Sequence, residues 1–459
     1  MAAEATAPLL RRLAKIPDLL ALAAAKPARY PALLESAAEG AGARWDILFA
    51  FPQEIIDADK RDFLPALDAA WRGAQIPRVE VDLPFRGGWL LYLGYELAAS
   101  IEPALKLPAS AGPMPTALAL RCPAAIIIDR YEQCGWLVAE STRADLMDQM
   151  VVDIAYDVIA PMALAELVGV IEDEAVDYLA GVERIHGYLA AGDVFQVNLS
   201  RAWHATFAGS VEPAALYASL RRANPAPFAA MLQWQGAAIV SSSPERLVHV
   251  QGDCVQVRPI AGTRARFPGD DDKARRDELI GHPKERAEHV MLIDLERSDL
   301  GRVAIPGSVF VDEMMTVESY THVHHIVSNI SARRRDRVTP GEIIRAVFPG
   351  GTITGCPKIR CMQIIAELEG VGRGAYTGSI GYLNRDGDMD LNILIRTLSV
   401  VGSGVDFRAG AGIVIDSDPA HELQETRAKA RGLLNALSGS DVRDSRTQPT
   451  PIVKTGMEK

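Results

Sequence analysis

The stretch GAGIVIDSDPAHELQE, residues 410–425, joins a glycine-rich apolar strand to a helix with an acidic start. The pair Asp418-Pro419 suits the N-cap and first helical positions. Glu422 and Glu425 stand three residues apart, so both project from one face of the predicted helix. The alternative is an ordinary exposed helix start, in which Glu425 pairs with Lys429 at the i,i+4 spacing.

A second helix with the same acidic spacing is predicted further up the chain, in PKERAEHVMLIDL at residues 283–295. Glu285 and Glu288 continue the apolar stripe of Leu292 and Leu295, so the pattern points them toward the interior. The alternative is a solvated first turn whose acids complement the helix dipole. Together the two E-x-x-E starts offer four carboxylates, which would suit Mg2+, a cation that takes one or two carboxylates plus water and substrate oxygens.

A glycine-rich loop, FPGGTITGCPK at residues 348–358, precedes another predicted helix. It is not a P-loop, because Cys356 and Pro357 stand where Lys and Ser or Thr are needed. Backbone N–H groups at such a helix start can bind a carboxylate, although a plain glycine-rich turn has the same pattern. Arg396 lies alone in the apolar run 393–398 and needs an anion, either a ligand or a structural partner. With the acid pairs, these features favour a small polycarboxylate ligand.

Three histidines lie close together at His322, His324 and His325. A transition-metal site is not favoured, because no cysteine or second spaced histidine pair accompanies them. Alternation along a strand puts His325 on the opposite face from the other two. His325 is therefore a candidate general acid or orienting group.

The composition excludes several functional classes. The chain has 459 residues, a formal net charge of −11, and 48% hydrophobic and 23% charged residues, which is typical of a soluble globular protein. Nucleic acid and anionic membranes are excluded as main partners, because both require a basic face. No apolar run reaches the roughly 18 residues of a membrane span. The five cysteines form no C-x-x-C pair, so we expect no zinc or disulfide framework and a cytoplasmic location.

The chain divides into three parts by composition. We expect an N-terminal region at residues 1–150, a larger catalytic part at 176–438 and a disordered tail at 439–459, where Ser, Asp, Arg, Thr and Pro accumulate. The start, MAAEA, has no basic segment leading into an apolar core, so no signal peptide is expected.

Several segments, taken in order, carry a resemblance to a known family. They are GDVFQVNL (192–199), SPER (243–246), PIAGT (259–263) and the stretches 284–295, 348–358 and 410–425. These resemble the chorismate-utilising enzymes, which include anthranilate, aminodeoxychorismate, isochorismate and salicylate synthases. The resemblance is strong over residues 180–430 and weaker at LLES (33–36) and GYE (94–96). It implies an α/β (α+β) fold, with two large antiparallel sheets flanked by helices and built by both halves of the chain.

The resemblance also implies a set of site residues for chorismate and Mg2+. The implied metal ligands are Glu288 and Glu425, supported by Glu285 and Glu422. The implied substrate-binding groups are Thr263, Tyr376, Arg396, Lys429 and the backbone of Gly410, Ala411 and Gly412. The residues implied to lie near the ring and the departing 4-hydroxyl are Glu245, His325 and Thr352. A general acid or a metal-polarised ring must help there, because hydroxide is a poor leaving group.

Within the family, Gln196 stands where the water-adding members carry a lysine base. An amide cannot deprotonate water, so the resemblance implies that ammonia is the nucleophile. The segments 224–230, 324–325 and 349–355 look like those of aminodeoxychorismate synthase component I, which makes 4-amino-4-deoxychorismate, the folate-pathway precursor of p-aminobenzoate. The catalytic position occupied by a lysine in the best-known members is Ala261 here, and alanine cannot be a nucleophile. Direct attack at C4, help from another group, and amination at C2 to give anthranilate are therefore all open.

None of the five cysteines lies in a G-x-C-x-G elbow, so we expect no built-in glutaminase. Ammonia would be taken up free or delivered by a separate glutaminase subunit. The alternative enzyme is anthranilate synthase component I. A catalytically silent chorismate- or tryptophan-binding protein is a further alternative, which the presence of all the named acids, the histidine and the arginine disfavours.

Overall fold

A computed structural model describes residues 7–38, 44–156, 163–265, 283–319 and 323–439, together with residues 274, 277 and 281. Within these ranges, the side chains of residues 261, 263–265, 283–285, 319 and 323–325 are not described. The predicted disordered tail lies outside the described residues except for Gly439. No helix in the described ranges combines the length and apolar character needed to cross a bilayer.

The larger sheet contains twelve described strands, all paired antiparallel. In spatial order they are β1 (Leu9–Arg12), β8 (Cys134–Ala139), β7 (Ala124–Asp129), β3 (Trp45–Ala50), β2 (Ala32–Glu35), β11 (Phe228–Trp234), β12 (Ala237–Ser243), β21 (Thr397–Val401), β22 (Gly404–Ile413), β10 (Gln196–Phe207) and β18 (Gly355–Cys356), with β9 (Leu167–Glu172) beside β10.

The second sheet contains ten described strands and is also antiparallel. In spatial order they are β15 (Ile260–Ala265), β17 (Val323–Arg333), β14 (Cys254–Val257), β13 (Arg246–Gln251), β20 (Met389–Asn392), β19 (Ser379–Asn384), β5 (Gly88–Leu93), β6 (Ala117–Cys122) and β4 (Ile55–Asp57), with β16 (Phe310–Ser319) beside β17. Pairing of β2 with β11 and of β5 with β19 confirms that both halves of the chain build the two sheets.

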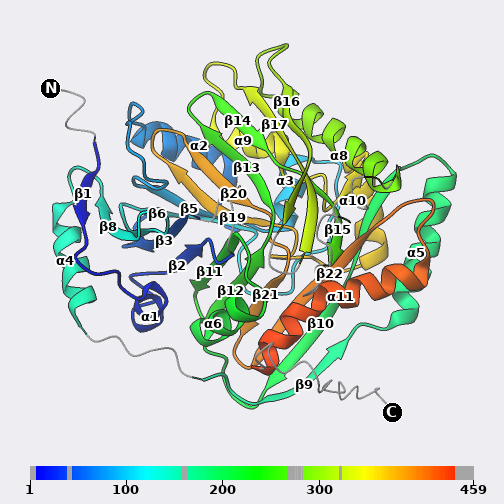
Figure 1. The fold of residues 1–459 in the computed structure, drawn as a ribbon, viewed down its shortest axis with the longest axis horizontal. Coiled ribbons are helices and arrows are strands. Elements are labelled where there is room, and N and C mark those ends of the chain that lie inside the picture. Colours follow the sequence, from blue (N-terminus) through cyan, green and yellow to red (C-terminus); the bar gives the residue numbers. More distant parts are fainter. Residues whose placement is uncertain are drawn as a thin grey trace.

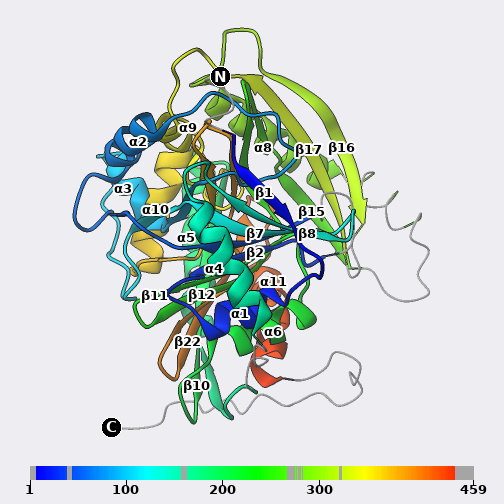
Figure 2. The same ribbon diagram turned by 90° about the vertical axis from the view of Figure 1, so that its left-hand side faces the viewer.

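Helices cover the sheets (Figure 1, Figure 2). Those with apolar residues in the core against the larger sheet are α1 (Leu19–Ala25), α4 (Ala144–Ala155), α6 (Pro213–Ala223) and α11 (Pro419–Ser438). Those that pack near β10 are α5 (Ala175–Ala190) and α10 (Lys358–Glu369). Those on the second sheet are α2 (Phe63–Ala74), the 3-10 turn η1 (Tyr95–Leu97), α3 (Ala98–Ile101), α8 (Pro283–Gly301) and α9 (Pro340–Val347).

Strand alternation explains this layering. On β5, Leu90 and Tyr92 pack in the cluster that holds side chains of both sheets, whereas Leu91 and Leu93 belong to the cluster beneath α2 and α9. Successive strand residues point to opposite faces, so a strand that is apolar at every position is buried on both. The fold is therefore a two-sheet sandwich with helices on its outer faces, as the sequence predicts.

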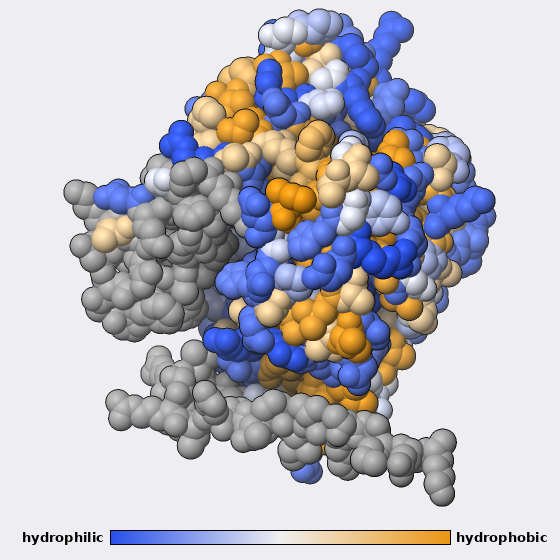
Figure 3. Space-filling model, turned by 90° about the vertical axis from the view of Figure 1, so that its right-hand side faces the viewer, coloured by the Kyte–Doolittle hydropathy of each residue, from blue (hydrophilic) through white to orange (hydrophobic). Residues whose placement is uncertain are grey.

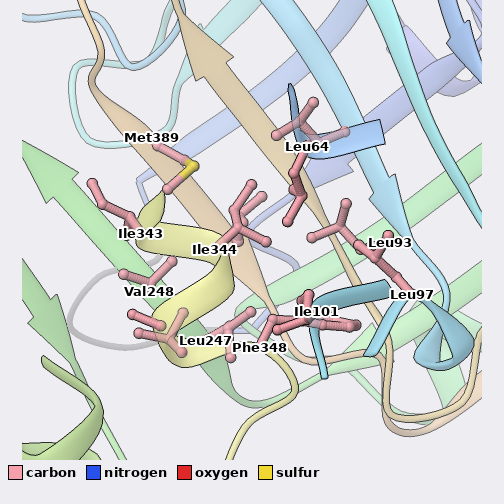
Figure 4. Close-up of a cluster of buried hydrophobic side chains, with 14 of the residues drawn as sticks. Leu64, Leu93, Leu97, Ile101, Leu247, Val248, Ile343, Ile344, Phe348 and Met389 are labelled. Carbon is pink, nitrogen blue, oxygen red and sulfur yellow. The ribbon is translucent and has the colours of Figure 1, made fainter. Parts of the chain in front are cut away.

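Helix α9 fixes the glycine-rich loop that follows it. Its N-terminus has a capping box, in which Thr339 and Glu342 each bond the other's backbone N–H. Ile343 and Ile344 are buried against Val248 of β13, among other apolar side chains (Figure 4). Burying one such side chain contributes about 1.5–3 kcal/mol. The loop that begins at Phe348 therefore starts from a rigid base.

On the face seen in Figure 3, apolar residues of the described chain form patches among polar ones. Exposed large apolar side chains in the described chain include Val168 and Ile171 on β9 and Val176 on α5. Apolar atoms make up more than half of a typical protein surface, so such patches need no function of their own.

Candidate functional site

The first half of the candidate site lies on α11. Asp418 accepts a hydrogen bond from the backbone N–H of His421 at 2.8 Å, which confirms the predicted N-cap. Glu422 is buried, and Glu425 lies 2.7 Å from Lys429. The alternative i,i+4 pair is therefore present. Lys429 also donates to the backbone carbonyl of Gly410 at 3.0 Å, so the pair faces β22 and does more than cover the helix surface.

The second half lies on α8, where Glu288 is half-buried. The side-chain amide of Gln196 donates to its carboxylate at 3.1 Å. Gln196 is only 4% exposed, and a Cβ atom placed on Gly412 would lie 2.3 Å from its Nε2 atom. Only glycine allows this approach. The side chain of Glu285, one turn earlier, lies outside the described residues.

The C-terminal end of β22 brings the two acidic helices together. Lys429 and Glu425 approach the strand at Gly410, whereas Gln196 and Glu288 approach it at Gly412. Strand β10 sets the register beside it, with Ser200 opposite Gly410 and Asn198 opposite Gly412. The E-x-x-E motifs, more than 130 residues apart in the sequence, therefore converge on one short stretch of strand.

These acids have the chemistry of a magnesium site. All the candidate ligands are carboxylates, the hard oxygen donors that Mg2+ takes in small number alongside water. The described side chains contain no group of three or more His, Cys, Asp or Glu residues that would hold a metal by themselves.

Tyr376 lines the other side of Gly410. A Cβ atom at this glycine would lie 2.9 Å from the Tyr376 hydroxyl and 2.7 Å from the carbonyl oxygen of Leu199. Burial raises the pKa of Tyr376 to about 12, so its hydroxyl stays protonated and can donate a hydrogen bond. Arg373 lies 5.5 Å from the centre of the same ring.

A buried ion pair supports Tyr376. Arg373 donates to Glu369 at 2.6 Å, and both side chains are 1% exposed. Arg408 contacts the same carboxylate at 3.2 Å. Glu96 accepts hydrogen bonds from the backbone N–H groups of Arg373 and Gly374, which ties the loop to the N-terminal part of the chain. Sequence reasoning missed this support, apart from noting the GYE segment.

Glu245 is the candidate acid of the site. It is 5% exposed, and its carboxylate accepts a hydrogen bond from the Thr352 hydroxyl at 2.7 Å. Burial raises its pKa to about 7, and the opposing contributions come from Thr352, the backbone N–H of Ile260 and the charges of Lys429 and Arg396. A carboxyl group with this pKa can hold a proton at neutral pH and release it.

Arg396 is the candidate anchor for an anion. Burial lowers the pKa of its guanidinium, and the charge of Glu245 partly opposes this shift. Among the described residues, its side chain makes no hydrogen bond or salt bridge. The structural ion pair considered for this arginine is therefore not found in the described part of the chain.

The glycine-rich loop holds one of the protein's own carboxylates. The N–H of Gly351, ahead of the start of α10, donates to Glu296 at 3.1 Å. The loop also contributes Thr352 to the site through its side chain. Carboxylate binding by the N–H groups at the start of α10 stays a prediction. The sequence pattern alone cannot tell whether these backbone N–H groups donate to a ligand carboxylate or to a buried glutamate of the protein.

Four predicted side chains lie outside the described residues, namely Glu285, Ala261, Thr263 and His325. The backbone of all four is placed: Glu285 lies in α8, and β15 pairs with β17 so that Ala261 stands opposite Ile326 and Thr263 opposite His325. Their side-chain roles stay predictions.

The comparisons with known proteins decide the family. A family model described as chorismate binding enzyme matches residues 30–435. The chain belongs to this family. It is a chorismate-utilising enzyme, and the resemblance noted in its motifs is confirmed at this level.

Its relatives in this family differ in the reaction that their names give. The chain is 42% identical over 372 residues to aminodeoxychorismate synthase component 1 of Bacillus subtilis, covering 78% of each chain. It is 43% identical over 362 residues to an anthranilate synthase component I-like protein of Synechocystis, covering 78% of this chain and 74% of the relative. It is 37% identical over 434 residues to an anthranilate synthase component 1 of Haloarcula marismortui, covering 87% and 86%.

Solved structures confirm the predicted fold. Anthranilate synthase component I from Streptococcus pneumoniae matches with a TM-score of 0.77 and 30% identity, over 86% of this chain and 93% of that one. The menaquinone-specific isochorismate synthase from Escherichia coli matches with a TM-score of 0.72 at 20% identity, over 94% and 95% of the two chains. The second likeness concerns the fold alone.

Proposed function

We propose that this enzyme is an aminodeoxychorismate synthase component I, which converts chorismate and ammonia to 4-amino-4-deoxychorismate and water. The observation that carries this proposal is Gln196. Its buried amide lies against Glu288 and Gly412, at the point where the two acidic helices meet. A side-chain amide has no basic group that could activate water, whereas ammonia already carries the lone pair needed for attack.

The anion-binding groups match the two carboxylates of chorismate. In this proposal Arg396, the Tyr376 hydroxyl and the backbone from Gly410 to Gly412 hold the enolpyruvyl carboxylate, with Lys429 and Thr263 in support. Arg396 is suited to this because a guanidinium that makes no salt bridge to a described residue gains strongly from a bidentate carboxylate.

Mg2+ would be held by Glu288 and Glu425, with Glu285 and Glu422 behind them. When bound, the cation neutralises the ring carboxylate and draws electron density from the ring. The four acids alone would repel a dianion, so the proposal requires the cation for substrate binding as well.

Glu245 is the proposed general acid, positioned by Thr352, with His325 as a second candidate on the neighbouring strand. The C–N bond forms from the ammonia lone pair at C4, and the C4–O bond breaks. The departing oxygen takes a proton from Glu245 and leaves as water, and the attached nitrogen returns one proton to the site. The raised pKa of Glu245 makes its proton available near pH 7.

Ammonia is proposed to come from a separate glutaminase subunit. Burial raises the pKa of the Cys122 thiol to about 12 and also raises those of Cys254, Cys356 and Cys361. A glutaminase nucleophile needs a lowered thiol pKa, so these cysteines are poor candidates for that chemistry.

Anthranilate synthase component I is the second candidate, because Ala261 replaces the lysine of the best-known C4-aminating members. The test is to incubate the purified protein with chorismate, Mg2+ and ammonium. A product that yields p-aminobenzoate only after a lyase is added supports the proposal. Fluorescent anthranilate and pyruvate formed without added lyase would refute it, and no turnover of either kind would favour a silent binding protein.

A further inference from the structure

The loop between α9 and α10 holds two buried glutamates with successive residues. The backbone N–H of Gly351 donates to Glu296 at 3.1 Å, and the hydroxyl of Thr352 donates to Glu245 at 2.7 Å. Glu296 comes from α8, and Glu245 comes from the turn between β12 and β13. Both side chains are buried. Because the donors Gly351 and Thr352 are neighbours in the chain, the position of one carboxylate limits the position of the other.

The packing beneath this loop leaves little freedom. A Cβ atom on Gly351 would lie 2.4 Å from Leu295 and 3.1 Å from the Glu296 carboxylate. At the far end of the loop, Lys358 contacts Asp299 of α8 at 2.5 Å and the carbonyl of Val347 at 3.3 Å. The loop is thus fastened to α8 at two points, and Glu296 provides one of them.

The charges around the two acids come from several elements. Burial raises the pKa of Glu296 to about 7; the charges of Asp299 and Glu245 raise it further, and Lys358 and the Gly351 N–H oppose them. Glu245 faces the cations Lys429 of α11 and Arg396. When two buried carboxyl groups interact, the two pKa values observed belong to the pair rather than to one residue each. The second proton is harder to remove, because the first ionisation leaves a negative charge nearby.

We propose that Glu296 is a positioning residue for the reaction, because it holds the Thr352 loop in place and its negative charge keeps a proton on Glu245. This inference deepens the proposed function and rests on it for the role of Glu245 as the acid. Glu296 itself lies behind the loop and touches no reacting atom. Without such a role, a glutamate at position 296 would only lower the stability of the fold, because a buried carboxylate without a full counter-charge is destabilising.

The test follows the infrared band of the protonated carboxyl groups as a function of pH. Comparison with Glu245→Gln assigns the band of Glu245. The test variant is Glu296→Gln, which keeps an acceptor for the Gly351 N–H and nearly the same volume but removes the charge. We expect the midpoint of the Glu245 band to fall in this variant, because a neighbouring negative charge disfavours the loss of its proton. In the amination assay, activity at alkaline pH should be lost at correspondingly lower pH.

The matched control is Asp294→Asn, which removes one charge from an exposed position on the same helix. It should leave the Glu245 midpoint at the wild-type value. Coupling is reciprocal, so Glu245→Gln should lower the midpoint of Glu296 by the same amount, and this second arm applies even if Glu296→Gln does not fold.

An unchanged Glu245 midpoint in Glu296→Gln, or an unchanged Glu296 midpoint in Glu245→Gln, would overturn the inference. The band titration needs no turnover. A wild-type enzyme that fails to aminate chorismate therefore refutes the proposed function and leaves the coupling measurement intact.

Discussion

Replacing Gly412 by alanine tests how the site is built around Gln196. The added Cβ would lie 2.3 Å from Gln196 Nε2 and 3.2 Å from its Cδ. No real pair of atoms tolerates such a separation, so the amide must move. The amide is the far end of a side chain and can rotate, but rotation breaks its 3.1 Å hydrogen bond to Glu288.

The size of the effect follows from that bond. A hydrogen bond to a charged group contributes about 1.5–3 kcal/mol. If the bond matters equally in the transition state, kcat/KM for ammonia should fall by about ten- to a hundredfold. The crowding should also lower the free energy of unfolding by about 1–3 kcal/mol, since an inserted methyl group in a packed site costs this much.

Thermal unfolding and the ammonia-dependent amination rate measure the two effects separately. Gly169→Ala is the matched control, because it adds the same methyl group to a strand where no atom lies within 4 Å. The double variant with Gln196→Ala should be more stable than the sum of the single changes predicts, because truncation removes the crowding. Wild-type rate and stability in Gly412→Ala, or strict additivity in the double variant, would refute this reasoning.

Three other predictions follow from contacts near the same strand. Gly410→Ala should lower the free energy of unfolding more than Gly412→Ala does, because its Cβ would lie 2.7 Å from a backbone carbonyl oxygen, which cannot rotate away. Thermal unfolding of the two variants measures the difference. Glu369→Gln should lower the free energy of unfolding by about 3–5 kcal/mol, because it leaves the buried Arg373 and the partly buried Arg408 without their charged partner. Glu367→Gln breaks a partly exposed ion pair and should lower it by at most about 1 kcal/mol in the same denaturant titration. Glu288→Gln should abolish activity together with its Mg2+ dependence, and full activity at limiting Mg2+ would remove this residue from the metal site.

Local signals in the sequence predicted the helices that carry the acids. The N-cap at Asp418 and the spacing of Glu422 and Glu425 depend only on residues within one or two turns, and the structure has that cap. Glu245 and Thr352 came from the family resemblance, because no local pattern marks two residues 107 positions apart that share a hydrogen bond.

The support around Tyr376 could not be predicted for the same reason. Glu96 bonds the backbone of Arg373 across 277 residues, and only the pairing of β5 with β19 brings these segments together. Glu296 was missed because an acid on a helix is normally solvated, and its burial depends on the loop that packs over it. Long-range packing, which decides which polar groups are buried, has no signature in a single sequence.

The net charge of −11 appears unsuited to a dianionic substrate, but the formal count overstates the negative charge at the site. Glu369 is paired with two arginines, Arg373 and Arg408, so its charge beside Tyr376 is compensated within the protein. Arg396 adds a cation near Glu245 that makes no salt bridge among the described residues. Glu245 and Glu296 have raised pKa values, so near neutral pH the pair retains part of its protons. For the acids proposed to hold Mg2+, a divalent cation between them and the substrate would turn repulsion into attraction.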